Sequence, residues 1–211
     1  MRTSELLQLA ERSRLRAEAV LAASDICNIW RSVGAEPHLV GSLRTGLLMT
    51  HRDIDIHIYS APFTLQDSFT AMARLTANPA ITRLECVNLL HTEECCVEWH
   101  AWQRDSDGEL WQIDMIHMPK GSPYDGYFES VADAIRAALT PETRTAILRL
   151  KYETPAEEKI MGIEYYQAVL EGGVRTLAEF RRWRAAHPVT GINLWKPEPP
   201  LPKPADGSAA G

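Results

Sequence analysis

The stretch that decides the fold is "GSLRTGLLMTHRDIDIHIY", residues 41–59. Its second half alternates strictly between polar and apolar side chains, which is typical of a β-strand with one buried face. The polar face carries Asp53, Asp55, His57 and Tyr59, and the buried face carries Ile54, Ile56 and Ile58. Two carboxylates about 6–7 Å apart on one strand face repel each other unless solvent or a cation screens them. The pair therefore indicates either two solvated acids at a strand end or a site for a divalent metal that prefers oxygen ligands, such as Mg²⁺.

A third carboxylate lies in a later strand pattern. In "WQIDMIHM", residues 111–118, Asp114 is surrounded by Ile113, Met115 and Ile116. An ionised group among apolar neighbours is costly unless it has a partner, and a metal ion is a fitting one. Asp53, Asp55 and Asp114 would together hold two ions about 4 Å apart, the spacing used for in-line phosphoryl displacement. The alternative is three exposed acids, each ordinary by itself.

Gly41 and Ser42 lie where a predicted strand, within residues 36–41, gives way to a short helix or turn at 44–49. Glycine lets a phosphate approach the backbone closely, and a helix N-terminus offers free N–H groups to an anion. Ser42 adds a hydroxyl, and Arg44 adds a positive charge. Alone, the pair fits any strand-to-helix turn, but it precedes the Asp-x-Asp pattern by about ten residues.

These residues resemble a known family. Gly41-Ser42, Asp53-x-Asp55 and the later Asp114 look like the motifs of the nucleotidyltransferase superfamily built on the DNA polymerase β palm. Its small bacterial members, such as aminoglycoside and lincosamide nucleotidyltransferases, are the nearest in style. The resemblance covers about residues 36–118.

The resemblance implies transfer of a nucleoside monophosphate from a nucleoside triphosphate to an acceptor hydroxyl, with release of pyrophosphate. It implies that Gly41 and Ser42 bind the triphosphate, and that Arg44, which matches a basic position found after Gly-Ser in some minimal members, contacts it too. It also implies that Asp53 and Asp55 bind both Mg²⁺ ions. Asp114 would bind the catalytic ion and help to deprotonate the acceptor. No acceptor motif is recognisable.

The predicted fold class is α+β, with a mixed sheet in a polymerase β-like domain at residues 1–122. This domain begins with a long helix at 4–31, capped by Thr3 or Ser4 and stopped at Gly34. A second helix at 64–78 precedes three strand patterns at 81–89, 94–103 and 109–118. "RDSDG", residues 104–108, joins the last two as a hairpin.

The remaining chain has only helical patterns. The predicted C-terminal helical region is 123–190, with helices at 128–139, 142–152, 156–170 and 176–186 separated by Pro and Gly. Residues 191–211 form a Pro-rich segment that is expected to be extended or disordered.

Composition narrows the class of protein. The 211 residues carry a net charge of −6 and no long basic run, which makes a small-molecule acceptor more plausible than a nucleic acid. No apolar run reaches the roughly 20 residues of a membrane span, and no secretory signal is visible. The four cysteines lack paired CxxC spacing, which favours reduced thiols in a cytoplasmic protein. The oligomeric state, the preferred base and the acceptor stay open.

Three other interpretations account for parts of this pattern. His51-Arg52-Asp53 looks like a kinase catalytic loop, but position 58 is Ile where that loop needs Asn, and no Gly-rich loop is present. A metallohydrolase using His51, Asp53 and His57 is a somewhat better rival. A non-catalytic nucleotide-binding module of the same fold is the main alternative, although such a module has no need for all three acids.

Several weaker candidates remain. Glu98 and His100 share one strand face, and Glu98 is an alternative general base if that strand adjoins Asp114. Lys151 and Lys159 would reach phosphates, although lysines at helical spacing are usually solvated. Tyr165 or Tyr166 would stack on a base, although such tyrosines are more often part of a core.

Overall fold

The computed structural model describes residues 1–198. In this part of the chain five strands form one mixed sheet in the order β1-β2-β5-β4-β3. The strands are β1 (Glu36–Leu39), β2 (Asp53–Ser60), β3 (Ile81–Asn88), β4 (Val97–Arg104) and β5 (Leu110–Pro119). The helices are α1 (Thr3–Ser24), α2 (Ile26–Arg31), α3 (Gly41–Thr45), α4 (Leu65–Leu75), α5 (Tyr127–Ala138), α6 (Pro141–Glu153), α7 (Gly162–Leu170) and α8 (Leu177–Ala186). No helix among them is long and apolar enough to cross a membrane. The predicted α+β class is confirmed.

The central pair of strands decides where the acids lie. β2 and β5 run parallel, whereas the β1–β2, β3–β4 and β4–β5 pairs are antiparallel. The predicted β4–β5 hairpin is confirmed: Asp105 N–H donates to Glu109 O at 2.9 Å, and Gly108 adopts φ +79°. Because the chain returns through this hairpin, β5 enters the sheet between β2 and β4.

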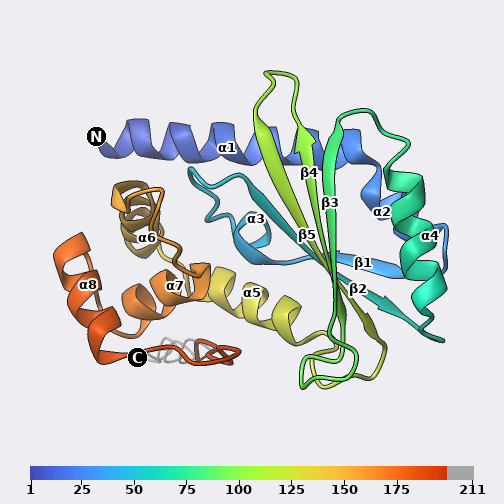
Figure 1. The fold of residues 1–211 in the computed structure, drawn as a ribbon. Coiled ribbons are helices and arrows are strands. Elements are labelled where there is room, and N and C mark those ends of the chain that lie inside the picture. The colour runs from blue at the N-terminus through green and yellow to red at the C-terminus, as the bar shows by residue number, and fades with distance from the viewer. Residues whose placement is uncertain (199–211) are drawn as a thin grey trace, which may run out of the picture.

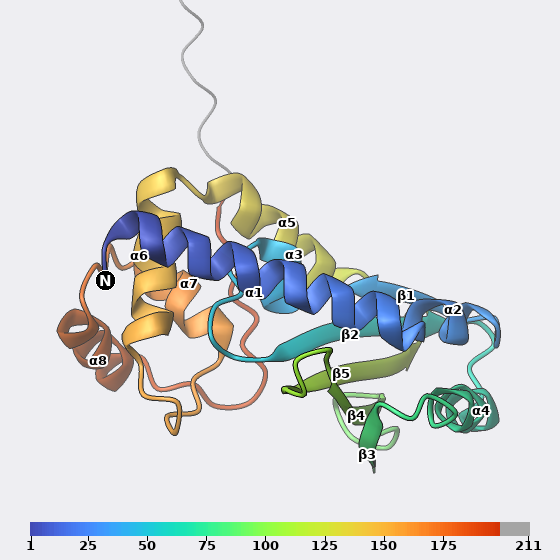
Figure 2. The same cartoon turned by 90° about the horizontal axis from the view of Figure 1, so that it is seen from above.

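The sheet buries one face, as the alternation predicted. Ile54, Ile56 and Ile58 are at most 1% exposed and belong to a core shared with Trp30 of α2 and Leu75 of α4. Figure 1 shows α2 and α4 on one side of the sheet and α3 and α5 on the other, and Figure 2 shows α2 and α4 together at one end of the molecule. The opposite, open face carries the polar residues of β2.

The N-terminal helix is interrupted, unlike the single helix predicted for residues 4–31. α1 ends at Ser24, and Asp25 adopts the left-handed conformation (φ 54°) before α2 begins. Asp is one of the residues that tolerate this region, because its short polar side chain bonds locally. The interruption re-aims the chain so that Ile26 and Trp30 are fully buried in the core beside the sheet. The N-cap is Arg2 rather than Thr3 or Ser4.

The helix α1 joins two hydrophobic cores. Its C-terminal half contributes Ala17 and Val20 to the sheet core. Its N-terminal half contributes Leu6 and Ala10 to a second core formed largely by the helices α5 to α8. Figure 1 shows α1 running from these helices to the far side of the sheet. The shared helix therefore fixes the helical region against the sheet.

Two C-terminal segments differ from the sequence pattern. The helix predicted at 156–170 begins only at Gly162, and residues 155–161 form an irregular connection. Residues 191–198 contain no helix or strand, but Trp195 packs against the second core and Tyr127 Oη donates to Leu194 O at 2.5 Å. Residues 199–211, where most of the predicted disordered tail falls, lie outside the described residues.

Candidate functional site

The strand registers place the polar side chains of the open face in rows. One row consists of Asp55, Asp114, His100 and Glu85, from β2, β5, β4 and β3. The row beside it consists of Asp53, Gln112, Trp102 and Arg83. Asp114 is thus the direct neighbour of Asp55 on a parallel strand and points to the same face. The structure brings together the three acids that the sequence singled out.

Asp55 is the most constrained of these acids. Burial, and then the neighbouring carboxylates of Asp53 and Asp114, raise the pKa of Asp55 to about 7, while Lys151 and a backbone hydrogen bond from Ser42 act in the opposite direction. A Cβ atom on Gly41, which has φ +62°, would lie 1.9 Å from Asp55 Oδ2. Position 41 therefore needs glycine both for its backbone conformation and for the space that the carboxylate occupies.

The acid cluster fits a divalent cation. The Oδ1 atom of Asp53 is buried and has no hydrogen-bond partner among the described residues. An unpaired buried carboxylate oxygen is costly, and a cation would supply its missing partner. The carboxylate oxygens of Asp53, Asp55 and Asp114 do not all lie within 4.8 Å of one another. Among residues 1–198, the potential metal ligands that do lie this close together in a group of three are Glu94, Cys96 and Glu98. Mutual repulsion separates such carboxylates, and a shared cation would draw them together.

Asp114 is held in place by its neighbours on the open face. His100 Nδ1 lies 2.5 Å from Asp114 Oδ1, and Gln112 Nε2 donates to the same oxygen at 2.7 Å. Glu98 Oε2 lies 3.8 Å from His100 Nε2, and burial raises the pKa of Glu98. The predicted proximity of Glu98 to Asp114 is real but indirect, because His100 lies between them.

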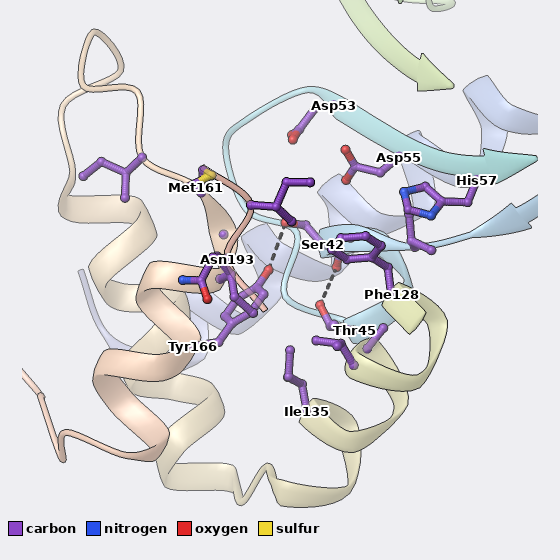
Figure 3. A pocket seen from close by; sticks show the side chains of 18 of the residues that line it. Ser42, Thr45, Asp53, Asp55, His57, Phe128, Ile135, Met161, Tyr166 and Asn193 are labelled. Atoms are coloured by element: carbon purple, nitrogen blue, oxygen red, sulfur yellow. Dashed lines mark hydrogen bonds between the residues drawn. The ribbon is translucent and has the colours of Figure 1, made fainter. Parts of the chain in front are cut away.

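A cavity of about 790 Å³ opens beside Asp53 and Asp55. Figure 3 shows these two carboxylates at one end, with Ser42 and Thr45 of α3, Tyr166 of α7 and Asn193 around the rest. Most of the apolar wall comes from α5, the α6–α7 connection and α7: Phe128, Val131, Ala132, Ile135, Ile160, Met161 and Ile163. Val40 and Ile192 complete it. The cavity thus lies between the sheet domain and the C-terminal helices, and both contribute to it.

A buried lysine reaches Ser42 from the helical region. Lys151 of α6 is 5% exposed and donates to Ser42 Oγ at 2.8 Å and to Leu47 O at 3.0 Å. Tyr166 Oη lies 3.0 Å from the same hydroxyl. The expectation of a solvated lysine was wrong for Lys151, because α6 packs directly against α1 and the connection after α3. Lys159 is exposed, and Tyr165 stacks on Phe180 in the second core.

Arg44 leaves α3 on another side. Its guanidinium pairs with Asp133 of α5 at 2.8 Å and donates to Leu39 O at 3.0 Å. It lines a separate cavity of about 440 Å³ and is not among the residues around the acids. The structure therefore places Arg44 away from the triphosphate position expected for it, because successive helical residues point in different directions.

The residues proposed for a metallohydrolase site do not all line the same cavity. His57 lines the cavity, and burial lowers its pKa to about 4, so the ring is neutral at pH 7. His51 is exposed in the connection before β2 and does not line that cavity. The cysteines Cys27, Cys86, Cys95 and Cys96 are free thiols. Cys95 adopts φ 49° before β4 begins, so the adjacent pair does not lie within a strand as predicted.

Known proteins resemble this chain in fold and not in sequence. No family model matches the sequence, and no curated protein matches it significantly. Solved structures do match. Cid1 poly(U) polymerase bound to MgGTP has a TM-score of 0.56 at 13% identity, over 80% of this chain and 54% of that one.

A cytoplasmic RNA terminal U-transferase gives a TM-score of 0.51 at 14% identity, over 79% of this chain and 54% of that one. Cid1 in complex with its short product ApU gives 0.52 at 14% identity, over 81% and 55%. This chain spans about half the length of these proteins. The chain has the polymerase β-like nucleotidyltransferase fold.

Proposed function

We propose that this protein is a magnesium-dependent nucleotidyltransferase that moves a nucleoside monophosphate from a nucleoside triphosphate to an acceptor hydroxyl. The observation that carries the proposal is the register of Asp55 against Asp114, beside Asp53 with its unpaired buried oxygen and an open cavity. The likeness of the fold to enzymes solved with bound nucleotides supports it.

Asp53, Asp55 and Asp114 are the residues that would hold Mg²⁺. Three carboxylates that converge on one face provide the hard oxygen ligands that this ion prefers, with positions left for water and phosphate oxygens. We propose two ions, which would offset the negative charge on the attacking and leaving oxygens. Without a cation the charged form of Asp55 is disfavoured, since burial, and then the carboxylates of Asp53 and Asp114, raise its pKa.

The triphosphate would be bound on Gly41 and Ser42. Both residues line the cavity beside Asp53 and Asp55. Lys151 and Tyr166 already contact the Ser42 hydroxyl and would supply a positive charge and a second hydrogen-bond donor to the phosphates. The helical region would thus complete the nucleotide site from the side opposite the sheet.

The reaction needs one new bond and one broken bond. The acceptor oxygen forms a bond to the α-phosphorus, the bond between that phosphorus and the bridging oxygen breaks, and pyrophosphate leaves. The hydroxyl proton passes to a carboxylate, for which Asp114 is the first candidate and Glu98 the second. His100 and Gln112 fix one oxygen of Asp114 and leave the other for the acceptor side.

Two observations bear on the identity of the acceptor. The acidic net charge favours a small molecule, whereas the solved proteins of similar fold are named for action on RNA.

The test is release of pyrophosphate from ATP, GTP, CTP and UTP in the presence of Mg²⁺ and panels of small-molecule and oligonucleotide acceptors. We expect release to require an acceptor and Mg²⁺, and to disappear in Asp53→Asn and Asp55→Asn. Asp107→Asn, which removes an exposed carboxylate from the β4–β5 turn, is the matched control and should keep full activity. Nucleotide binding without release under every condition would instead indicate a non-catalytic module.

A further inference from the structure

A tryptophan lies on the open face of the sheet beside the acids. Trp102 of β4 is half-buried and paired with Gln112, so it is the diagonal neighbour of Asp114. Diagonal neighbours across antiparallel strands are about 7–8 Å apart. The other tryptophan of this strand, Trp99, points to the opposite face, where it is buried and its Nε1–H donates a hydrogen bond to Ser68 Oγ. Trp102 therefore lies on the open face of the sheet, with the acids, and not in the core.

One arginine contacts this ring, and a second lies on the same face of β4. The guanidinium of Arg83 lies 4.3 Å from the Trp102 ring centroid, and the Arg83 side chain is 60% exposed. Arg83 is also paired with Glu85. Arg104 follows Trp102 by two residues on the same face of β4, is exposed and donates to Gly108 O at 2.8 Å. We call Arg83, Trp102 and Arg104 the stacking platform.

None of the platform residues lines the cavity beside Asp53 and Asp55. Small-molecule sites are concave and bury most of their ligand. A flat aromatic and guanidinium surface suits a nucleobase instead, since bases of single strands stack on aromatic rings and on arginine planes. The exposed Leu110, which pairs with Arg104, adds further apolar surface to the same region.

We propose that the stacking platform binds the terminal nucleotide of a single-stranded nucleic acid, which is the acceptor. The terminal base stacks on Trp102 and Arg83, Arg104 contacts a phosphate of the strand, and the 3′ hydroxyl reaches Asp114. Its oxygen then attacks the α-phosphorus of the bound triphosphate, its proton passes to Asp114 or Glu98, and pyrophosphate leaves. This inference rests on the proposed function and replaces a small-molecule acceptor with a polymer end.

The first experiment measures binding separately from turnover. The assay records the fluorescence anisotropy of labelled single-stranded RNA and DNA oligonucleotides of about twelve nucleotides. Each is mixed with the full chain, Mg²⁺ and a non-hydrolysable triphosphate. We expect Trp102→Ala to raise the dissociation constant about tenfold or more, and Trp102→Phe to raise it much less because it keeps a ring. The matched control is Trp183→Ala, which removes a ring of α8 that stacks on His187. This variant should bind as the unchanged protein does.

The second experiment measures transfer. Trp102→Ala should raise the KM for the oligonucleotide about tenfold and leave the KM for the triphosphate unchanged, whereas a folding defect would lower activity at every concentration of both substrates. Equal affinity of the unchanged protein and Trp102→Ala for oligonucleotides overturns the proposal, as does transfer to small molecules alone. Either result leaves the nucleotidyltransferase assignment intact if pyrophosphate is still released, and that assignment fails separately if Asp53→Asn keeps full activity.

Discussion

The carboxylate of Asp55 occupies the space in which any side chain at position 41 would stand. A Cβ atom on Gly41 would approach Asp55 Oδ2 to 1.9 Å. One residue proposed to bind the triphosphate is therefore in direct contact with one of the proposed metal ligands.

Gly41→Ala should abolish nucleotidyl transfer and lower the free energy of unfolding by more than the roughly 1–2 kcal/mol that a left-handed backbone conformation costs a non-glycine residue. Gly108→Ala is the matched control, because Gly108 also has a positive φ but has no atom within 4 Å of the added Cβ. It should cost only the conformational strain and keep activity. Chemical denaturation and pyrophosphate release measure the two effects, and equal losses of stability in both variants would contradict the clash.

Asp53→Asn should make the melting temperature of the protein nearly independent of Mg²⁺. In the unchanged protein, Mg²⁺ with a non-hydrolysable triphosphate should raise the melting temperature, because ligands that bind only the folded state stabilise it. Asp53→Asn should lose most of this increase. Its melting temperature in EDTA should equal or exceed that of the unchanged protein, because one of the charges that raise the pKa of Asp55 is gone. A lower melting temperature in EDTA would show that Asp53 stabilises the fold without metal.

Lys151→Met should weaken triphosphate binding. The substitution keeps an unbranched apolar stem in the buried position and removes the charge that contacts Ser42 Oγ and Leu47 O. Because a hydrogen bond to a charged group contributes about 1.5–3 kcal/mol, the KM for the triphosphate should rise about 10- to 100-fold. The control is Lys159→Met, at an exposed position in the connection before α7. An unchanged KM in Lys151→Met would restrict Lys151 to a structural role.

His100→Ala should loosen Asp114 without touching the triphosphate. Residues that orient metal ligands typically affect metal affinity or activity about 10- to 100-fold when removed. We expect the Mg²⁺ concentration for half-maximal activity to rise by such a factor and the KM for the triphosphate to stay constant. His91→Ala, at an exposed loop position, is the control. A change confined to the melting temperature would argue against this positioning role.

His117 should make the protein less stable in mild acid. It is fully buried, its Nε2 lies 2.7 Å from Ser60 Oγ, and burial lowers its pKa to about 4. Between about pH 6.5 and 4 the unfolded chain binds the proton that the folded chain excludes, so the free energy of unfolding falls as pH falls through this window. A shift of this size corresponds to roughly 3 kcal/mol at most.

His117→Asn removes the titrating group, so its free energy of unfolding should fall less between pH 6.5 and 4 than that of the unchanged protein. Urea denaturation at several pH values measures the difference. The carboxylates and His57 titrate in both proteins and cancel in the comparison. Parallel pH profiles for the two proteins would exclude His117 as the source.

Part of the candidate site could be predicted from sequence because the relevant signals are local. The period of two in residues 53–59 fixes which side chains share a face, and the apolar setting of Asp114 indicates that it needs a partner. The Asp-Gly turn predicts the β4–β5 hairpin. Each inference uses only neighbours within a few residues.

Other features depend on distant parts of the chain. Ser42 and Lys151 are separated by 109 positions, and nothing in the pattern of α6 distinguishes Lys151 from a solvated lysine. The partner of Arg44 lies 89 positions away on α5, which turns a predicted phosphate ligand into half of an ion pair. The interruption at Asp25 also escaped the helical pattern, because the apolar spacing continues across it.

The sequence by itself determined the alternating strand, its two faces and the identities of the three acids, because strand geometry assigns side chains to faces through the backbone alone. Only the tertiary structure decided that β5 lies between β2 and β4, which brings Asp114 beside Asp55 and sets Trp102 of β4 next to the strand that carries Asp114. The order of strands depends on long-range packing and pairing free energies summed over the whole chain, and no local pattern carries that sum.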